Sequence, residues 1–437
     1  MDKIQLITAE LRRLRKARYF GKVVSIGGGL VRVAGLVVHG SVGDRVEFLR
    51  ESGEAGGGEI VAIDRGEVSV LPDGSTEGLS IGIRVELLFA PLLAPDDSWI
   101  GRVIDPLGRP LDGHPIDSGV EDRGFRAPPP PATQRKRLGE RLRSGLAVFD
   151  TFLPIVRGQR IGLFAGSGVG KSTLLSALAR GVEADVVVIA MIGERGRELR
   201  EFIEEVLGPE GMKRAVIVAA TSDQSPLMRR RCAWAGMTVA EHFRDQGKHV
   251  LFLADSVTRF AEAHREIALA SGESPSYRGF PPSVSHLIMS LAERAGPGAM
   301  GSGDITAVFS VLVAGSDMEE PVADILRGVL DGHVVLDRSI AERGRFPAVD
   351  VLRSVSRSLP HAATEAENGQ LARARAALGL YAESELMIRA GLYAQGTDAR
   401  LDEAVRIYPA LDAFFTRKSG SVPESFQMLS SALQPGR

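Results

Sequence analysis

The segment IGLFAGSGVGKST, residues 161–173, runs from an apolar stretch into a glycine-rich loop that ends in Lys171 and Ser172. A short strand, a loop rich in glycine and a following helix together turn backbone N–H groups toward phosphate oxygens. The first position of the strict pattern is Ala165 instead of glycine, but the three inner glycines and the Lys-Ser pair are present. We therefore predict a phosphate-binding loop made of Ala165, Gly166, Ser167, Gly168, Val169, Gly170, Lys171, Ser172 and Thr173.

Two acidic residues follow other apolar runs of the central region. The run VVVIAMIG leads into Glu194, and the run HVLFLADS contains Asp255. The carboxyl ends of parallel strands meet at one edge of a sheet, so both carboxylates are expected beside the loop. There Lys171 would bind the phosphates, while Ser172 and Asp255 would hold Mg²⁺. Glu194 would orient and deprotonate the water that attacks the terminal phosphorus, which predicts nucleoside triphosphate hydrolysis.

Simpler roles stay open for these residues. Glu194 also suits a surface position that caps the following helix, and Asp255 suits a helix N-cap. Arg259, one turn beyond Asp255, either neutralises phosphate charge or pairs with Glu262. The sequence lacks the Asn-Lys-x-Asp signature of guanine recognition, which favours adenine or no strict choice of base.

The pattern of apolar residues divides the chain into parts. The central runs, which include RAVIVAAT and ITAVFSVLVAG, lack alternation, as do strands of a parallel sheet covered on both faces. Before them lie six short alternating runs separated by glycine-rich turns, which predict a small β-barrel. After Arg357 helical spacing replaces the strand patterns. We expect a helix at 1–20, a β-barrel at 21–90, a P-loop α/β domain with a mostly parallel sheet at 91–350 and a helical domain at 351–437.

The first residues predict a basic amphipathic helix. Ile4, Ile7, Leu11 and Leu14 follow the spacing of one helix face, opposite the basic residues between Arg12 and Arg18. Such a helix either lies on anionic lipid, docks a partner, or packs on its own domain.

Composition excludes several classes of protein. The chain has 437 residues, of which 44% are hydrophobic, and 53 basic residues nearly balance 55 acidic ones. Overall charge therefore predicts neither a nucleic-acid partner nor a membrane surface. A single cysteine, Cys232, excludes internal disulfides and cysteine-based zinc sites and fits a reducing compartment, with the cytoplasm as the expected location. We find neither an apolar run long enough to cross a bilayer nor the apolar core of a signal peptide.

With these residues placed, the chain resembles the ATPases of the flagellar protein-export apparatus. These are relatives of the virulence type III secretion ATPases and of the rotary ATP synthase α and β subunits. The resemblance covers nearly the whole sequence and rests on IGRVIDPLGRPLDG, RGQRIGLFAGSGVGKST, IGERGRE, EHFRDQGKHVLFLADSVTRFAEAHREIALASGE, RGFPPSV and DGHVVLDRSIAERGRFPAVDVLRSVSR. It implies an N-terminal β-barrel, a RecA-like ATPase core and a C-terminal helical domain, arranged as a homohexamer with ATP or ADP and Mg²⁺ at the subunit boundaries.

The resemblance also implies roles for residues that the loop pattern does not reach. Arg195 and Arg259 match arginines of the family's phosphate site. Phe346 matches the aromatic residue that stacks on adenine, and Arg357 matches a catalytic arginine that enters the site of the neighbouring subunit. The non-catalytic ring subunits lack the glutamate of IGER, whereas this chain carries both Glu194 and Arg357. One polypeptide therefore supplies both halves of a site.

The partners that the family implies are a stalk-like coiled-coil export protein, a dimeric ATPase regulator at the N-terminal helix, chaperone–substrate complexes and a membrane export gate. They imply a position at the inner-membrane export apparatus and no nucleic-acid partner. The virulence secretion ATPase is the nearest alternative. A Rho-like RNA translocase is a further one, but its barrel would display aromatic residues for base stacking, and here Phe48 is nearly alone.

Overall fold

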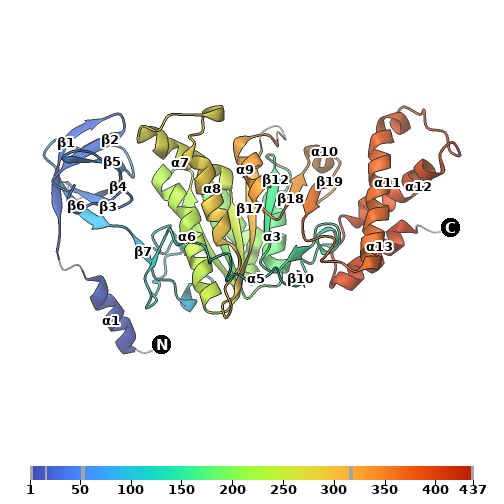
Figure 1. The fold of residues 1–437 in the computed structure, drawn as a ribbon, viewed down its shortest axis with the longest axis horizontal. Helices are drawn as coiled ribbons and strands as arrows, with labels where there is room; N and C mark the ends of the chain where they lie inside the picture. The colour runs from blue at the N-terminus through green and yellow to red at the C-terminus, as the bar shows by residue number, and fades with distance from the viewer. Residues whose placement is uncertain (1–2, 15–16, 51–54, 314–317, 435–437) are drawn as a thin grey trace.

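The computed structural model describes residues 3–14, 17–50, 55–313 and 318–434. Figure 1 shows three bodies along the long axis of the molecule: a barrel, a central layered domain and a group of helices. The first body confirms the predicted barrel, which closes in the order β1-β2-β5-β4-β3-β6. Its strands are β1 (Phe20–Gly27), β2 (Leu30–Ala34), β3 (Arg45–Leu49), β4 (Ala55–Ile63), β5 (Glu67–Pro72) and β6 (Arg84–Phe89).

A mostly parallel sheet forms the centre of the molecule, in the order β19-β18-β12-β17-β15-β13-β14-β8. The five predicted apolar runs are all strands: β12 (Arg160–Ala165), β13 (Val186–Glu194), β14 (Ala215–Thr221), β15 (His249–Asp255) and β17 (Asp304–Leu312). The last residues expected in the fifth run lie outside the described residues. The pattern did not reveal the remaining members: β8 (Val103–Ile104), β16 (Gly296–Pro297), β18 (Gly332–Leu336) and β19 (Val349–Ser356).

Both faces of the sheet are covered, as the unbroken apolar runs require. Along β13, Val187 and Ile189 pack into one hydrophobic core with α3 and the C-terminal helices, whereas Val186 and Val188 pack into a second core with α6 to α9. This alternation gives every residue of the strand an apolar environment. The helices of the central domain are α2 (Ala147–Asp150), α3 (Lys171–Gly181), α4 (Gly196–Glu201), α5 (Gly208–Met212), α6 (Pro226–Asp245), α7 (Val257–Ala270), α8 (Ser283–Arg294), α9 (Pro321–Val329) and α10 (Arg338–Glu342).

Short elements complete the central domain. They are β7 (Leu92–Leu93), β9 (Arg123–Gly124), β10 (Arg141–Leu142), β11 (Ile155–Val156), the 3₁₀-helices Asp97–Trp99 and Tyr277–Gly279, and a π-helical turn, Phe202–Leu207.

The C-terminal part is helical, as predicted, and consists of α11 (Glu365–Arg389), α12 (Ala399–Phe414) and α13 (Val422–Leu433). Helix α11 begins with a capping box in which Thr364 and Glu367 satisfy each other's backbone N–H groups. Leu371 of α11 and Ile407 of α12 belong to the same core as the phosphate-loop helix α3. The helical domain is therefore packed against the domain that holds the site.

The N-terminal helix is α1 (Lys3–Arg13), and the predicted continuation at 15–16 lies outside the described residues. It lies apart from the barrel in Figure 1 and contacts the central domain through Arg13, which pairs with Asp122 at 2.8 Å. Its apolar stripe is exposed, with Ile4 at 71% and Leu11 at 61%. Packing on its own domain therefore does not cover this stripe. No described helix is long and apolar enough to cross a membrane.

Candidate active site

The predicted phosphate loop joins the end of β12 to the start of α3. Gly168 and Gly170 adopt positive φ angles of 76° and 85°, which side-chain-bearing residues rarely adopt. Val169 between them is 2% exposed and anchors the loop in the core, while Ser172 and Thr173 are exposed on the first turn of the helix. The loop therefore presents its backbone and the positive end of a helix to solvent, as a phosphate site requires.

Three chemical groups from separate elements meet at this edge of the sheet. Lys171 Nζ lies 3.5 Å from Glu194 Oε1 and forms a close ion pair with Asp255 Oδ1. All three side chains are largely buried, Asp255 most deeply at 2% exposure. Ser310 of the neighbouring strand β17 donates its hydroxyl to Asp255 Oδ1 at 2.6 Å and fixes the carboxylate. The structure thus brings together the three residues that sequence reasoning derived from three strand ends.

The electrostatics of this cluster favour proton transfer at Glu194. Burial raises the pKa of Glu194, Lys171 opposes that effect, and the nearby Asp255 carboxylate adds to it. Burial alone would lower the pKa of Lys171, but Asp255 and Glu194 outweigh it and raise the pKa, so the ammonium stays charged. A carboxylate of raised pKa is a stronger base than an exposed one.

Phe346 lies against the phosphate loop. A Cβ atom built on Gly170 would sit 3.2 Å from Cδ1 of the Phe346 ring, so a side chain there would press on the ring, and the positive φ of 85° also favours glycine. The ring is 51% exposed. It therefore offers an aromatic face to solvent beside the loop.

Arg195 and Arg259, to which the family resemblance gives a role at the phosphate site, each pair with a glutamate of their own helix or its first turn. Arg195, which directly follows Glu194, is 79% exposed and pairs with Glu198 at 3.1 Å. Arg259 pairs with Glu262 at 2.9 Å, as the simpler interpretation expected, and its stem packs beside Gly193.

Arg357 follows β19 at the opposite end of the sheet from the phosphate loop. Ser356 pairs with Gly332 at the start of β18, whereas Leu336 at the end of β18 pairs with Ala165 at the start of the loop. The structure therefore does not bring Arg357 to the loop of its own chain.

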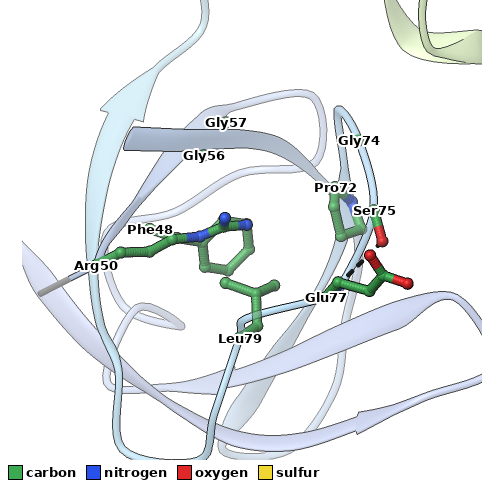
Figure 2. A pocket seen from close by; sticks show the side chains of 9 residues that line it. All are labelled: Phe48, Arg50, Gly56, Gly57, Pro72, Gly74, Ser75, Glu77 and Leu79. Atoms are coloured by element: carbon green, nitrogen blue, oxygen red, sulfur yellow. Dashed lines mark hydrogen bonds between the residues drawn. The ribbon is translucent and has the colours of Figure 1, made fainter. Parts of the chain in front are cut away.

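A cavity of about 600 Å³ in the barrel is separate from this cluster (Figure 2). Arg50 and Glu77 are its charged members, and the N–H of Glu77 donates to Ser75 Oγ at 3.0 Å. It is lined by Phe48, Arg50, Gly56, Gly57, Pro72, Gly74, Ser75, Glu77 and Leu79, none of which was predicted as a site residue.

Sequence reasoning missed Ser310, which positions Asp255. The contact joins residues 55 positions apart on adjacent strands, so no local motif announces it. It also missed the link between the barrel and the core: Glu59 of β4 accepts from Arg230 Nη2 at 2.7 Å and from Arg231 Nη2. A run of three arginines in α6 was the available signal.

Comparison with known proteins places this geometry in a family. Residues 145–356 match the nucleotide-binding domain of the ATP synthase alpha/beta family, and residues 363–431 match the C-terminal domain of the type III secretion ATPase EscN. The flagellum-specific ATP synthase of Caulobacter vibrioides is 43% identical over 98% of this chain and 99% of its own length. This chain belongs to the flagellar and type III secretion ATPase family.

Other members of the flagellar and type III secretion ATPase family agree in sequence and in shape. The type 3 secretion system ATPase of Xanthomonas euvesicatoria is 42% identical over 93% of this chain and 92% of its own length. The assembled ATPase EscN in complex with its central stalk EscO, from the type III secretion system of enteropathogenic E. coli, matches with a TM-score of 0.84 at 36% identity. That match covers 94% of this chain and 100% of the EscN chain in that structure. The barrel, the ATPase core and the helical domain are thus those of an ATPase of this family.

Proposed function

We propose that Lys171, Ser172, Glu194 and Asp255 form the catalytic centre of a Mg²⁺-dependent ATPase. The meeting of Lys171, Glu194 and Asp255 beside the phosphate loop carries this proposal. The donor set fits the metal, because the Ser172 hydroxyl and the Asp255 carboxylate are the oxygen ligands that Mg²⁺ prefers. Bound Mg²⁺ would neutralise charge on the phosphate oxygens.

The groups of the protein itself have separate roles in binding the phosphates and in activating the water. The backbone N–H groups from Gly166 to Gly170 and the Lys171 ammonium hold the phosphates in place. Glu194, whose pKa is raised by burial, orients the attacking water and accepts its proton. Arg195 follows Glu194 in the chain and the stem of Arg259 packs beside Gly193, so both would face the phosphate charge once they leave Glu198 and Glu262.

Phe346 is proposed to stack on the adenine base. Its half-exposed ring lies beside Gly170, at the end of the loop that also begins helix α3. Any purine or pyrimidine presents a π-face to such a ring, so the stacking contributes affinity without strict choice of base.

Arg357 is proposed to serve a neighbouring subunit. Arg357 follows Ser356, which pairs with Gly332 at the start of β18. The phosphate loop begins at Ala165, which pairs with Leu336 at the end of β18, four residues further along this strand. At ~3.3 Å per residue this is a displacement of ~13 Å, about twice the reach of an arginine side chain. Its exposed guanidinium makes one backbone contact, to the carbonyl of Arg327. A ring of identical subunits, which we propose to be a hexamer, lets each chain complete the site of the next.

We propose that this hydrolysis assists the export of flagellar proteins. The near full-length match to a flagellum-specific ATP synthase supports this role, and the comparable identity to the Xanthomonas enzyme keeps virulence secretion as the second candidate. Because EscN is described with a central stalk, we propose a coiled-coil stalk partner for this chain. The further proposed partners are export chaperones with their substrates and a membrane export gate, reached from the cytoplasmic side.

The exposed stripe of α1 is the proposed contact for a dimeric regulator. Ile4, Ile7, Leu11 and Leu14 are between 57% and 71% exposed, whereas Arg13 holds the helix to the central domain. For the domains we propose the divisions 1–20, 21–90, 91–356 and 357–437. The boundary expected at 350 moves past β19, because that strand pairs with β18 of the central sheet.

Two variants test the catalytic centre. Glu194→Gln keeps the size of the side chain but removes the base, so we expect nucleotide binding to persist while turnover falls by ~10²–10⁴-fold. Lys171→Ala removes the only lysine charge of the loop, so binding and turnover should both fall. Fluorescent-nucleotide binding and phosphate release measure the two quantities. Equal losses of binding and turnover in Glu194→Gln would show that Glu194 is structural.

The export role has its own test. In the source organism, Glu194→Gln at the native locus should abolish motility while leaving the abundance of the protein unchanged. Motile cells would refute the flagellar assignment, and a loss of virulence-type secretion in the same strain would favour the second candidate.

A further inference from the structure

Arg345 and Phe346 are consecutive residues that contact different domains. Phe346 lies against Gly170 of the phosphate loop, whereas the Arg345 side chain, 9% exposed, contacts the C-terminal helical domain. Its guanidinium lies 5.1 Å from the centre of the Phe415 ring, and its Nε lies 3.5 Å from Asp412 Oδ1 of α12. The segment that carries the aromatic ring is therefore fastened to α12 one residue before the ring.

The Arg345 guanidinium makes a second contact on the other side of the boundary. Its Cζ lies over the Phe415 ring, and its Nη2 donates to the carbonyl of Val349 at 2.7 Å, at the start of β19. Burial lowers the pKa of Arg345, and the Asp412 carboxylate opposes that effect. The guanidinium serves three partners at once, an aromatic ring, a carboxylate and a backbone carbonyl, and the compact ammonium of a lysine does not offer the same spread of donors. Arg345 thus bridges α12 and β19 across the segment that holds Phe346.

Other contacts cross the same boundary, including the hydrogen bond from Arg375 Nη1 of α11 to the carbonyl of Val351 at 2.9 Å. A cavity of about 200 Å³ lies between the 337–352 segment and helices α11 and α12, and Arg345 is part of its wall. On the helical side the wall contains the stacked rings of Tyr381 and Tyr408, whose centres are 3.6 Å apart. Atoms that face a cavity lose the packing contacts of a filled interface. Among the contacts across this boundary, those of Arg345 lie one residue from Phe346 along the chain.

We propose that Arg345 is a positioning residue that ties Phe346 to helix α12, so that the C-terminal helical domain controls the strength of base stacking. This inference rests on the proposed stacking role of Phe346. It makes the placement of the helical domain a determinant of ATP affinity, acting through a residue that does not itself contact the nucleotide.

The experiment is a double-mutant cycle on steady-state ATPase kinetics, with Arg345→Met and Phe346→Ala made singly and together in the full chain. Methionine keeps the apolar stem but removes the guanidinium. Stacking is equal in ground and transition states, so its loss raises KM and leaves kcat nearly unchanged. Removing a stacked aromatic corresponds to a ~5- to 150-fold rise in KM, and disturbing a coupled residue to a ~2- to 30-fold rise.

Arg343→Met is the matched control. Arg343 also faces the helical domain, where it pairs with Glu385 of α11 at 3.6 Å, but it is half-exposed and two residues further from Phe346 along the chain. We expect Arg345→Met to raise KM and Arg343→Met to leave it unchanged. In the Phe346→Ala background we expect Arg345→Met to add nothing, because the ring through which it acts is gone.

Two other outcomes would overturn the proposal, and they can be told apart. Additive effects of Arg345→Met and Phe346→Ala on KM would overturn it while leaving the stacking role intact. An unchanged KM in Phe346→Ala alone would overturn the stacking role, and this inference with it. If Arg345→Met does not fold, Asp412→Asn removes the same ion pair from the α12 side and decides the question by the same cycle.

Discussion

The buried ion cluster between the barrel and the core yields a large and specific stability prediction. Glu59 of β4 accepts from both Arg230 and Arg231 of α6, and all three side chains are at most 6% exposed. Glu59→Ala leaves two buried guanidiniums without their carboxylate, a change that costs ~3–5 kcal/mol in comparable clusters. For unfolding of the barrel and its contact with the core, a unit of small-protein size with a urea dependence of ~2 kcal/mol per molar, the midpoint should fall by ~1.5–2.5 M.

Arg32 and Glu67 provide the control on the same barrel. Their charged atoms are 3.9 Å apart, and the side chains are 58% and 38% exposed. Such a pair contributes ~0.2–1 kcal/mol, so Glu67→Ala should shift the midpoint by at most ~0.5 M.

Tryptophan fluorescence during urea unfolding is the assay, since the Arg230 guanidinium lies 5.0 Å from the Trp234 ring. Equal midpoints for Glu59→Ala and Glu67→Ala would refute the argument that burial makes this cluster important.

Further predictions concern the metal and pH. Ser310→Ala removes the hydroxyl that donates to Asp255 Oδ1, so the Mg²⁺ concentration for half-maximal turnover should rise by ~10-fold or more; an unchanged Mg²⁺ titration would show that Ser310 has no positioning role. Burial lowers the pKa of His249 and of His264 to about 4, below their unfolded value of 6.5. The unfolded chain therefore binds more protons in this window, and stability should be full above pH 6.5 and decline as the pH falls toward 4. Melting temperatures at pH 7 and pH 5 measure this loss of stability. His249→Asn should reduce the difference between the two melting temperatures more than the same change at exposed His114.

The sequence was most informative where chemistry and periodicity are local. The phosphate loop is contiguous, and it was predicted from its three inner glycines and the Lys171-Ser172 pair. Glu194 and Asp255 each end a strand whose unbroken apolar run is recognisable without knowledge of its neighbours. Because the carboxyl ends of parallel strands lie at one edge of a sheet, the sequence also predicted that Lys171, Glu194 and Asp255 lie close together, as they do.

The remaining features depend on contacts between distant segments. Strand β18 is five residues long and β19 is an antiparallel edge with mixed burial, so neither resembles the buried parallel strands around them. The antiparallel direction of β19 and its register on β18 determine that Arg357 lies at the far end of the sheet from Ala165. Likewise, the amphipathic pattern of α1 gives the apolar stripe but not its exposure, which depends on what lies opposite Ile4 and Leu11.

The shared site between subunits is tested most directly by mixing two inactive chains. Arg357→Ala retains its phosphate loop and Lys171→Ala retains its arginine, so a boundary between them can form one intact site. An arginine supplied in this way contributes ~10³–10⁵ in rate, so each variant alone should be nearly inactive. When the two chains assemble at random at an equal ratio, about a quarter of the subunit boundaries combine an intact phosphate loop with an intact arginine. We predict that phosphate release by the mixed rings rises above both parents and follows the mixing ratio. Verified mixed rings that stay as inactive as either parent at every ratio would contradict a site completed by the neighbouring subunit.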